Sequence, residues 1–99
     1  MTTNRSRILE LLAQRRQEIT TRFGVKQVSL FGSAARDELN ANSDVDVLVE
    51  FEGPATVAAY MDLKFYLEDL LGRPVDLVTD KALRKELRSY VEKEMIRVA

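Results

Sequence analysis

The chain has 99 residues, of which 45% are hydrophobic, and its 15 Lys and Arg residues nearly balance 16 Asp and Glu residues. This composition excludes a disordered or fibrous protein and predicts one folded domain over residues 1–99. The formal net charge of −1 gives no electrostatic reason to expect nucleic-acid binding. Cysteine and histidine are absent, which excludes disulfides, Cys/His zinc sites and His-based catalytic triads. Acid–base or metal chemistry must therefore depend on carboxylates, hydroxyls, Lys or Arg.

The N-terminal segment shows the pattern of an amphipathic helix over residues 4–22. Apolar side chains recur there at three- and four-residue steps, Gly24 ends the pattern, and Thr2, Thr3 or Asn4 can cap its start. Its arginines form either a solvated face or a docking surface for an acidic partner or RNA, and we favour the solvated face because no aromatic residues lie between them. No apolar run is long enough to span a bilayer and no secretory signal is evident, so we expect a cytoplasmic protein without a membrane partner.

Two strands follow, with a glycine–serine turn after the first. Residues 25–31 alternate as a strand does, and Gly32 comes directly after them. Ser33 is a good N-cap for a short helix that extends to about Leu39. Residues 44–51 form the second strand, which has one apolar face and an apolar residue among its polar ones, as is typical of a central strand covered on both sides.

The remainder of the chain predicts a helix over residues 56–71, a strand over 74–79, a helix over 81–95 and a short extended tail. Because the third strand returns from the second through a helix, this pair should be parallel, whereas the short link between the first two strands makes them antiparallel. The predicted fold class is α/β (α+β): a small mixed sheet of about three strands flanked by helices, in the order α-β-α-β-α-β-α. The inner stripe expected for the last helix is Leu83, Leu87, Tyr90 and Val91.

This topology places three acidic residues at one end of the sheet. Asp44 and Asp46 lie at the start of the second strand, and their side chains share one face because the side-chain period of a strand is two. Asp76 lies at the start of the parallel third strand, and the antiparallel first strand brings Gly32 to the same edge. The sequence therefore predicts carboxylates opposite a turn whose free backbone N–H groups can bind phosphate.

Carboxylates at one edge can hold two Mg²⁺ ions, because Mg²⁺ prefers oxygen ligands and is commonly shared with substrate phosphates. We predict that Asp44, Asp46 and Asp76 are both the metal ligands and the catalytic residues, and that Asp76 accepts the proton of the attacking hydroxyl. An Asp-x-Asp pair alone is weak evidence, since aspartates often lie at strand starts as caps or turn residues. The combination with the turn is what favours chemistry. The predicted nucleotide-binding residues are Gly32, Ser33 and Arg36.

Residues 30–36 and 43–51 resemble the spaced Gly-Ser and Asp-x-Asp motifs of the DNA polymerase beta-like nucleotidyltransferases. Within that superfamily the chain is similar to the minimal nucleotidyltransferases, a group that includes the MntA-type antitoxins paired with HEPN-domain toxins. The resemblance covers nearly the whole chain, and Asp76 matches the third carboxylate of the group. It implies a mixed sheet flanked by helices, and transfer of AMP from ATP to a protein hydroxyl, typically a tyrosine of the toxin, with Mg²⁺. A homo- or hetero-oligomer is compatible with it.

The chain departs from the group at two positions near the turn. The group often has glycine after the arginine, where this chain has Asp37, a residue type that tolerates left-handed backbone better than most. Members often have a further arginine just after the Gly-Ser, where this chain has Ala34. Fewer positive charges near the triphosphate weaken nucleotide binding, but neither change removes a predicted metal ligand.

Two alternative functions follow from the same residues. In the first alternative, the chain is an antitoxin that neutralises the toxin by contact alone, and the apolar face around Tyr60, Met61 and Phe65 is its docking surface. In the second alternative, the chain transfers nucleotides to a small molecule. The second alternative usually requires an additional domain. Because a chain of this length has no second substrate-binding domain, the acceptor is expected to be another macromolecule or another subunit.

Overall fold

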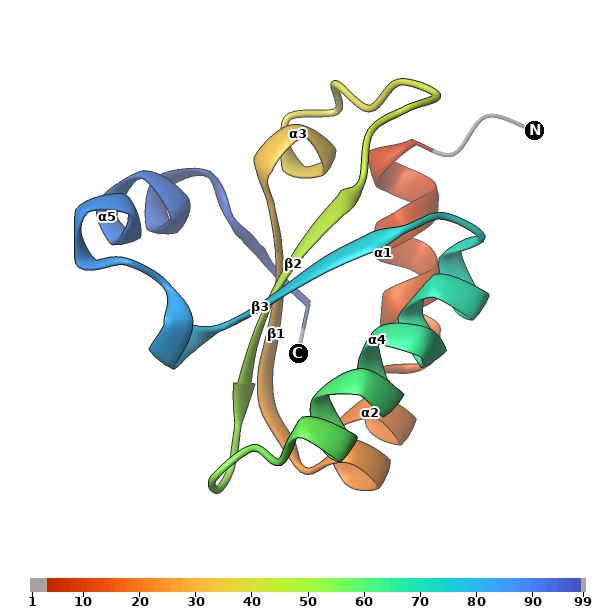
Figure 1. Ribbon diagram of the computed structural model, residues 1–99. Coiled ribbons are helices and arrows are strands. Elements are labelled where there is room, and N and C mark those ends of the chain that lie inside the picture. The colour runs from red at the N-terminus through yellow and green to blue at the C-terminus, as the bar shows by residue number, and fades with distance from the viewer. Residues whose placement is uncertain (1–3, 99) are drawn as a thin grey trace.

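A computed structural model describes residues 4–98 as a small mixed sheet with helices on both sides (Figure 1). The elements follow one another in the predicted alternation of helices and strands. In chain order they are α1 (Arg5–Gln14), α2 (Arg16–Phe23), β1 (Val25–Phe31), α3 (Gly32–Ala35), β2 (Val45–Phe51), α4 (Val57–Leu71), β3 (Val75–Thr79), the 3-10 helix η1 (Asp80–Ala82), α5 (Lys85–Glu94) and β4 (Ile96–Arg97).

The sheet has the strand order β3-β2-β1-β4. As predicted, β1 pairs with β2 antiparallel and β2 pairs with β3 parallel. The sheet has four strands where about three were predicted, because the C-terminal tail forms β4, which pairs antiparallel with Ser29 and Leu30 of β1. The fold class is thus the predicted mixed α/β class with one additional short edge strand.

The hydrophobic core lies between the sheet and helices α1, α2 and α4, which cover one of its faces (Figure 1). Alternate strand residues point into this core, as the period of two requires. Helix α5 lies on the opposite side of the sheet, and α3 lies at the end of the sheet where β1 ends. Fully or almost fully buried side chains of the core include Ile8, Leu12, Ile19, Val28, Leu30, Val45, Val47, Val49, Leu63 and Leu67.

The N-terminal segment contains two helices and not the single helix predicted over residues 4–22. The helices meet at Arg15, whose backbone (φ −105°, ψ 7°) is not helical. Asn4 caps α1 through its side chain, which accepts a hydrogen bond from the N–H of Arg7 at 2.9 Å, whereas Thr2 and Thr3 lie outside the described residues. Gly24 ends α2 in the left-handed conformation, as predicted.

Two further helix predictions were wrong in their bounds. The short helix α3 begins at Gly32 and ends at Ala35, so Ser33 is a residue of the helix and not its N-cap. The last helix begins at Lys85 and ends at Glu94, because the chain first forms η1 after β3. In contrast, α4 agrees with the prediction: the Thr56 hydroxyl accepts a hydrogen bond from the N–H of Ala59 at 3.0 Å.

The inner stripe predicted for the last helix was also wrong. Of its four residues, Val91 is buried, whereas Leu87 is 49% and Tyr90 is 70% exposed. Helix α5 contacts α3 and is bound to Asp80 through Arg88, whereas Leu87 and Tyr90 extend into solvent. Within residues 4–98, no helix is both long and apolar enough to cross a bilayer.

Candidate active site

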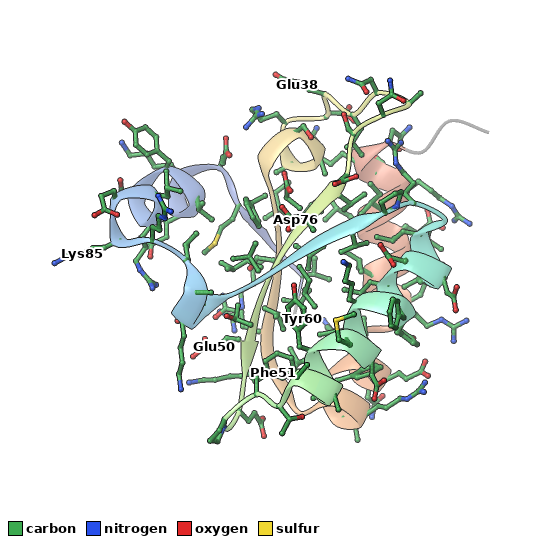
Figure 2. The ribbon with its side chains drawn as sticks, in the orientation of Figure 1. Glu38, Glu50, Phe51, Tyr60, Asp76 and Lys85 are labelled. Atoms are coloured by element: carbon green, nitrogen blue, oxygen red, sulfur yellow. The ribbon has the colours of Figure 1, made fainter. Side chains whose placement is uncertain are left out.

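The predicted acidic residues lie at the end of the sheet next to α3. Asp46 and Asp76 are direct partners in the parallel pairing of β2 and β3, and Asp44 comes just before β2 begins. Asp46 is half-buried, whereas Asp44 and Asp76 are exposed. Figure 2 shows Asp76 toward this end of the sheet, and Glu50 of β2 toward the other end. Parallel pairing therefore brings together Asp46 and Asp76, which are 30 positions apart in the sequence.

The position of Asp46 is electrostatically unfavourable for its charged form. The pKa of Asp46 is raised from its ordinary 3.8 to about 6, and burial is the largest cause. The negative charges of Asp76 and Asp44 and a side-chain hydrogen bond with Asp76 also raise the pKa, and the positive charge of Arg36 partly opposes the rise. Clustered carboxylates with a perturbed pKa are typical of functional sites, because a fold gains no stability from such repulsion.

Gly32 allows the turn after β1 to approach Asp46. Its φ of +66° lies in the left-handed region that side chains disfavour. A Cβ at this position would overlap Oδ2 of Asp46 and lie 3.0 Å from its Cγ. Only glycine therefore permits both the backbone conformation and the close contact between the turn and the carboxylate.

Asp37 lies at the position where this group of proteins often has glycine, and its backbone is left-handed, as we expected. It is the one non-glycine residue with a positive φ, +59°, among residues 4–98. Its Oδ1 accepts a hydrogen bond from the N–H of Arg5 at 3.0 Å, which holds the start of α1 beside the turn after α3. Ala34, at the second departure, is completely buried and leaves no room for a longer side chain without rearrangement.

Arg36 binds carboxylates of the protein itself. Its guanidinium donates to Glu38 at 3.1 Å and to both oxygens of Glu94 at 2.9 and 3.1 Å. The hydrogen bonds with Glu38 and Glu94 raise the pKa of Arg36, which is exposed. Sequence reasoning did not find Glu94, because it lies 58 residues from Arg36 on α5 and no local pattern connects the two. Binding of a triphosphate by Arg36 thus has to compete with Glu94.

The donor set at this end of the sheet suits Mg²⁺, although the carboxylates do not form a complete site by themselves. Among residues 4–98, no three acidic side chains are arranged to hold a metal ion. Asp46 and Asp76 do interact directly, and their mutual repulsion is what a divalent cation would relieve. Mg²⁺ is commonly bound by one or two carboxylates together with substrate phosphates. The pair therefore fits a metal that arrives with a nucleotide.

A hollow of about 480 Å³ lies at the opposite ends of β2 and β3 and includes none of the predicted site residues. Apolar side chains such as Phe51, Pro54 and Val57 line it, and the hydroxyl of Tyr60 is already hydrogen-bonded to the carbonyl of Leu77 at 2.5 Å. Because this hollow lies away from Asp46 and Asp76, it cannot be where these carboxylates act.

Comparison with known proteins identifies the family, since residues 12–98 match the model described as the nucleotidyltransferase domain. The chain belongs to this family. A relative from Thermococcus cleftensis, the protein adenylyltransferase MntA, is 38% identical over 92% of this chain and 92% of its own. A solved structure assigned as a minimal nucleotidyltransferase is 42% identical, with a TM-score of 0.75, over 89% of this chain and 93% of that one. A chain of the MntA–HepT toxin–antitoxin structure is 25% identical, with a TM-score of 0.61, over 97% of this chain and 69% of its own.

These likenesses establish that the protein is a nucleotidyltransferase and that its fold is that of the minimal nucleotidyltransferases. The resemblance inferred from the Gly-Ser and Asp-x-Asp motifs is therefore confirmed. The roles assigned to individual side chains remain predictions, and the geometry above is what supports them.

Proposed function

We propose that the protein is a Mg²⁺-dependent adenylyltransferase that moves AMP from ATP to a hydroxyl of a partner protein, and that this partner is a HEPN-domain toxin. The observation that carries the proposal is the contact between Gly32 and Asp46 beside Asp76. A phosphate-binding turn and a carboxylate pair meet there with no intervening side chain. Such an arrangement suits a phosphoryl group held between backbone donors and metal-binding oxygens.

In the reaction, the acceptor oxygen forms a bond to the α-phosphorus of ATP, and the bond from that phosphorus to the oxygen of the β-phosphate breaks. Pyrophosphate leaves, and Asp76 accepts the acceptor's proton. Together with phosphate oxygens of ATP, Asp44, Asp46 and Asp76 would hold two Mg²⁺ ions, which supply positive charge to the attacking and leaving oxygens when bound. The N–H groups at the start of α3 and the Ser33 hydroxyl hold the outer phosphates.

The identity of the relatives supports a protein acceptor. The Thermococcus relative is described as a protein adenylyltransferase, and MntA is found with HepT in a toxin–antitoxin complex. By resemblance to this group, we propose a tyrosine of the toxin as the acceptor and silencing of the toxin as the result. Asp44 and Asp76 are exposed, so a large partner can reach these carboxylates.

The test is incubation of the protein with the toxin, labelled ATP and Mg²⁺. We expect label on the toxin from the natural protein and none above background from the Asp44→Asn, Asp46→Asn double variant. Replacement of the exposed Asp62 by asparagine is the matched control, because it changes the same chemical group on α4, away from the site. Equal labelling by the natural protein and the double variant would exclude the proposed mechanism.

A second candidate is neutralisation by binding alone, and exposed apolar side chains favour it. Val57 and Phe65 on α4 are 80% and 54% exposed, and two apolar side chains of α5 are exposed as well. Met61 and Tyr60, which were predicted to share this docking face, are partly buried instead. The same double variant separates the two functions: full protection from the toxin by the double variant favours binding, whereas loss of protection favours catalysis.

A further inference from the structure

A cavity of about 120 Å³ lies between the sheet and α5, on the face of the sheet that carries Asp46. Ser29 of β1 and Leu48 of β2, which are partners in the antiparallel pairing, form part of its floor. Leu83 and Met95, from the segments before and after α5, form apolar walls. The cavity is distinct from the carboxylate pair, and sequence reasoning did not identify it.

The hydroxyl of Ser29 has no hydrogen-bond partner. Ser29 is 1% exposed, and its Oγ is the one buried side-chain oxygen or nitrogen without a partner within residues 4–98. A buried hydroxyl that has lost its water without gaining a partner destabilises a fold. Because this oxygen lines the cavity, a ligand that enters the cavity can supply the missing hydrogen bond.

The cavity lies at the right place for one part of a bound nucleotide. Asp46 pairs with Phe31 in the β1–β2 register, and Leu48 pairs with Ser29 one step further along the same face. Two residues of a strand span about 7 Å. A nucleotide whose phosphates lie between Gly32 and Asp46 can therefore reach this cavity when its sugar and base extend along the same face.

The chemistry of the cavity selects a class of ligand. Apolar side chains on its floor and walls suit a flat ring, and its polar edge consists of the Gln27 amide, three carboxylates and Arg88. Arg88, the cation of this edge, is bound to Asp80 through its carboxylate at 2.9 Å and its carbonyl at 3.1 Å. The carboxylates of Glu50 and Glu92 also line the cavity and can accept hydrogen bonds from an amino group.

We propose that this cavity binds the base of the nucleotide and prefers bases with an exocyclic amino group, which adenine, cytosine and guanine have and uracil lacks. Ser29 gains its hydrogen bond from the edge of that base, and the carboxylates at the cavity edge accept from the amino group. Uracil presents a carbonyl in place of the amino group and is disfavoured beside carboxylates. This inference rests on the proposed function, because it takes the triphosphate to lie beside Gly32.

The experiment compares the binding of ATP, CTP, UTP and inorganic tripolyphosphate, each with Mg²⁺, by calorimetry. For the natural protein we expect ATP and CTP to bind more tightly than UTP and tripolyphosphate. Ser29→Ala should lose about 5- to 10-fold in ATP affinity, the usual effect of one neutral hydrogen bond, and leave tripolyphosphate affinity unchanged. Ser89→Ala, the same change at an exposed position of α5, is the control and should leave both affinities unchanged.

Ser29→Ala is expected to fold, because it removes only an unpaired hydroxyl. Ser29→Val is the second variant, since it replaces the hydroxyl by methyl groups that narrow the cavity of about 120 Å³, and it should bind tripolyphosphate but no longer distinguish ATP from UTP. Equal ATP affinity in Ser29→Ala and the natural protein overturns the inference. If tripolyphosphate and ATP bind equally to the natural protein while AMP transfer proceeds, the base site is wrong and the proposed function stands. If ATP binds through Ser29 but no transfer occurs, the proposed function fails and the base site stands.

Discussion

Asp46→Asn should stabilise the protein in the absence of divalent metal, although it should abolish nucleotidyl transfer. The reason is that Asp46 must be charged near neutral pH in a half-buried position next to Asp76 and Asp44. Asparagine keeps the shape of the side chain and removes the charge. Substitution of a residue that stabilises the fold would lower the free energy of unfolding instead. The sign of the change in this free energy therefore distinguishes a structural role of Asp46 from a functional one.

The size of the effect follows from the pKa of Asp46, which rises from 3.8 to about 6 on folding. That difference corresponds to about 3 kcal/mol if the whole rise acts on stability. Because Asp46 is only half-buried and water screens its neighbours, we expect about 1–1.5 kcal/mol. Below pH 3.8 the group is protonated in both states and costs nothing, between pH 3.8 and 6 the penalty grows, and above pH 6 it is complete.

Urea denaturation in EDTA at pH 4 and pH 7.5 measures this difference. The Asp46→Asn variant should exceed the natural protein in free energy of unfolding by about 1–1.5 kcal/mol at pH 7.5 and by close to zero at pH 4. Asp62→Asn, on the exposed side of α4, is the control and should show no comparable pH-dependent gain. Addition of Mg²⁺ and ATP should stabilise the natural protein and not the Asp46 variant. A variant that is less stable than the natural protein at pH 7.5 would refute the reasoning.

The remaining predictions concern the turn, Arg36 and the metal. Gly32→Ala should lower the free energy of unfolding by about 2–4 kcal/mol and abolish transfer, because φ is +66° and the new Cβ overlaps Asp46. The control Gly72→Ala, with a φ of +67° and no atom within 4 Å of the new Cβ, should lower it by about 1–2 kcal/mol and leave transfer intact. Denaturation and labelling assays measure the two effects. Glu94→Gln should raise the affinity for tripolyphosphate several-fold in calorimetry, because it weakens the ion pair with Arg36. The control Glu86→Gln, on the exposed surface of α5, should leave this affinity unchanged. Unchanged affinity in Glu94→Gln would exclude competition between Glu94 and phosphate for Arg36. Removal of divalent metal with EDTA should abolish labelling of the toxin, and Mg²⁺ should restore it; labelling that persists in EDTA would contradict metal dependence.

The sequence predicted the strands and their directions because short-range patterns determine both. Val45, Val47 and Val49 occupy every second position of β2 and are fully buried against the helices. The helix between β2 and β3 requires a parallel pair, and this alone places Asp76 beside Asp46. The position of Gly32 beside the carboxylates followed from the antiparallel link between β1 and β2.

The C-terminal part was predicted less well, because its packing depends on distant contacts. The spacing of Leu87, Tyr90 and Val91 indicates an amphipathic helix, but spacing does not reveal which side meets the sheet. The structure buries Val91 and exposes the other two. The ion pair of Arg36 with Glu94 also depends on where α5 lies, so the sequence alone could assign Arg36 to a phosphate and not to a carboxylate.

The two faces of the sheet differ in how well their polar groups are satisfied, and this difference locates the function independently of any motif. The face against α1, α2 and α4 is apolar and closely packed. The other face carries the half-buried charge of Asp46 and the unpaired hydroxyl of Ser29, whose strand pairs lie two register positions apart. Each is a cost to the empty protein that a bound group of opposite character removes, a cation in one case and a hydrogen-bonding ring in the other. Under the proposed function, a single nucleotide with its metal would supply both, so substitutions that stabilise this face should also weaken nucleotide binding.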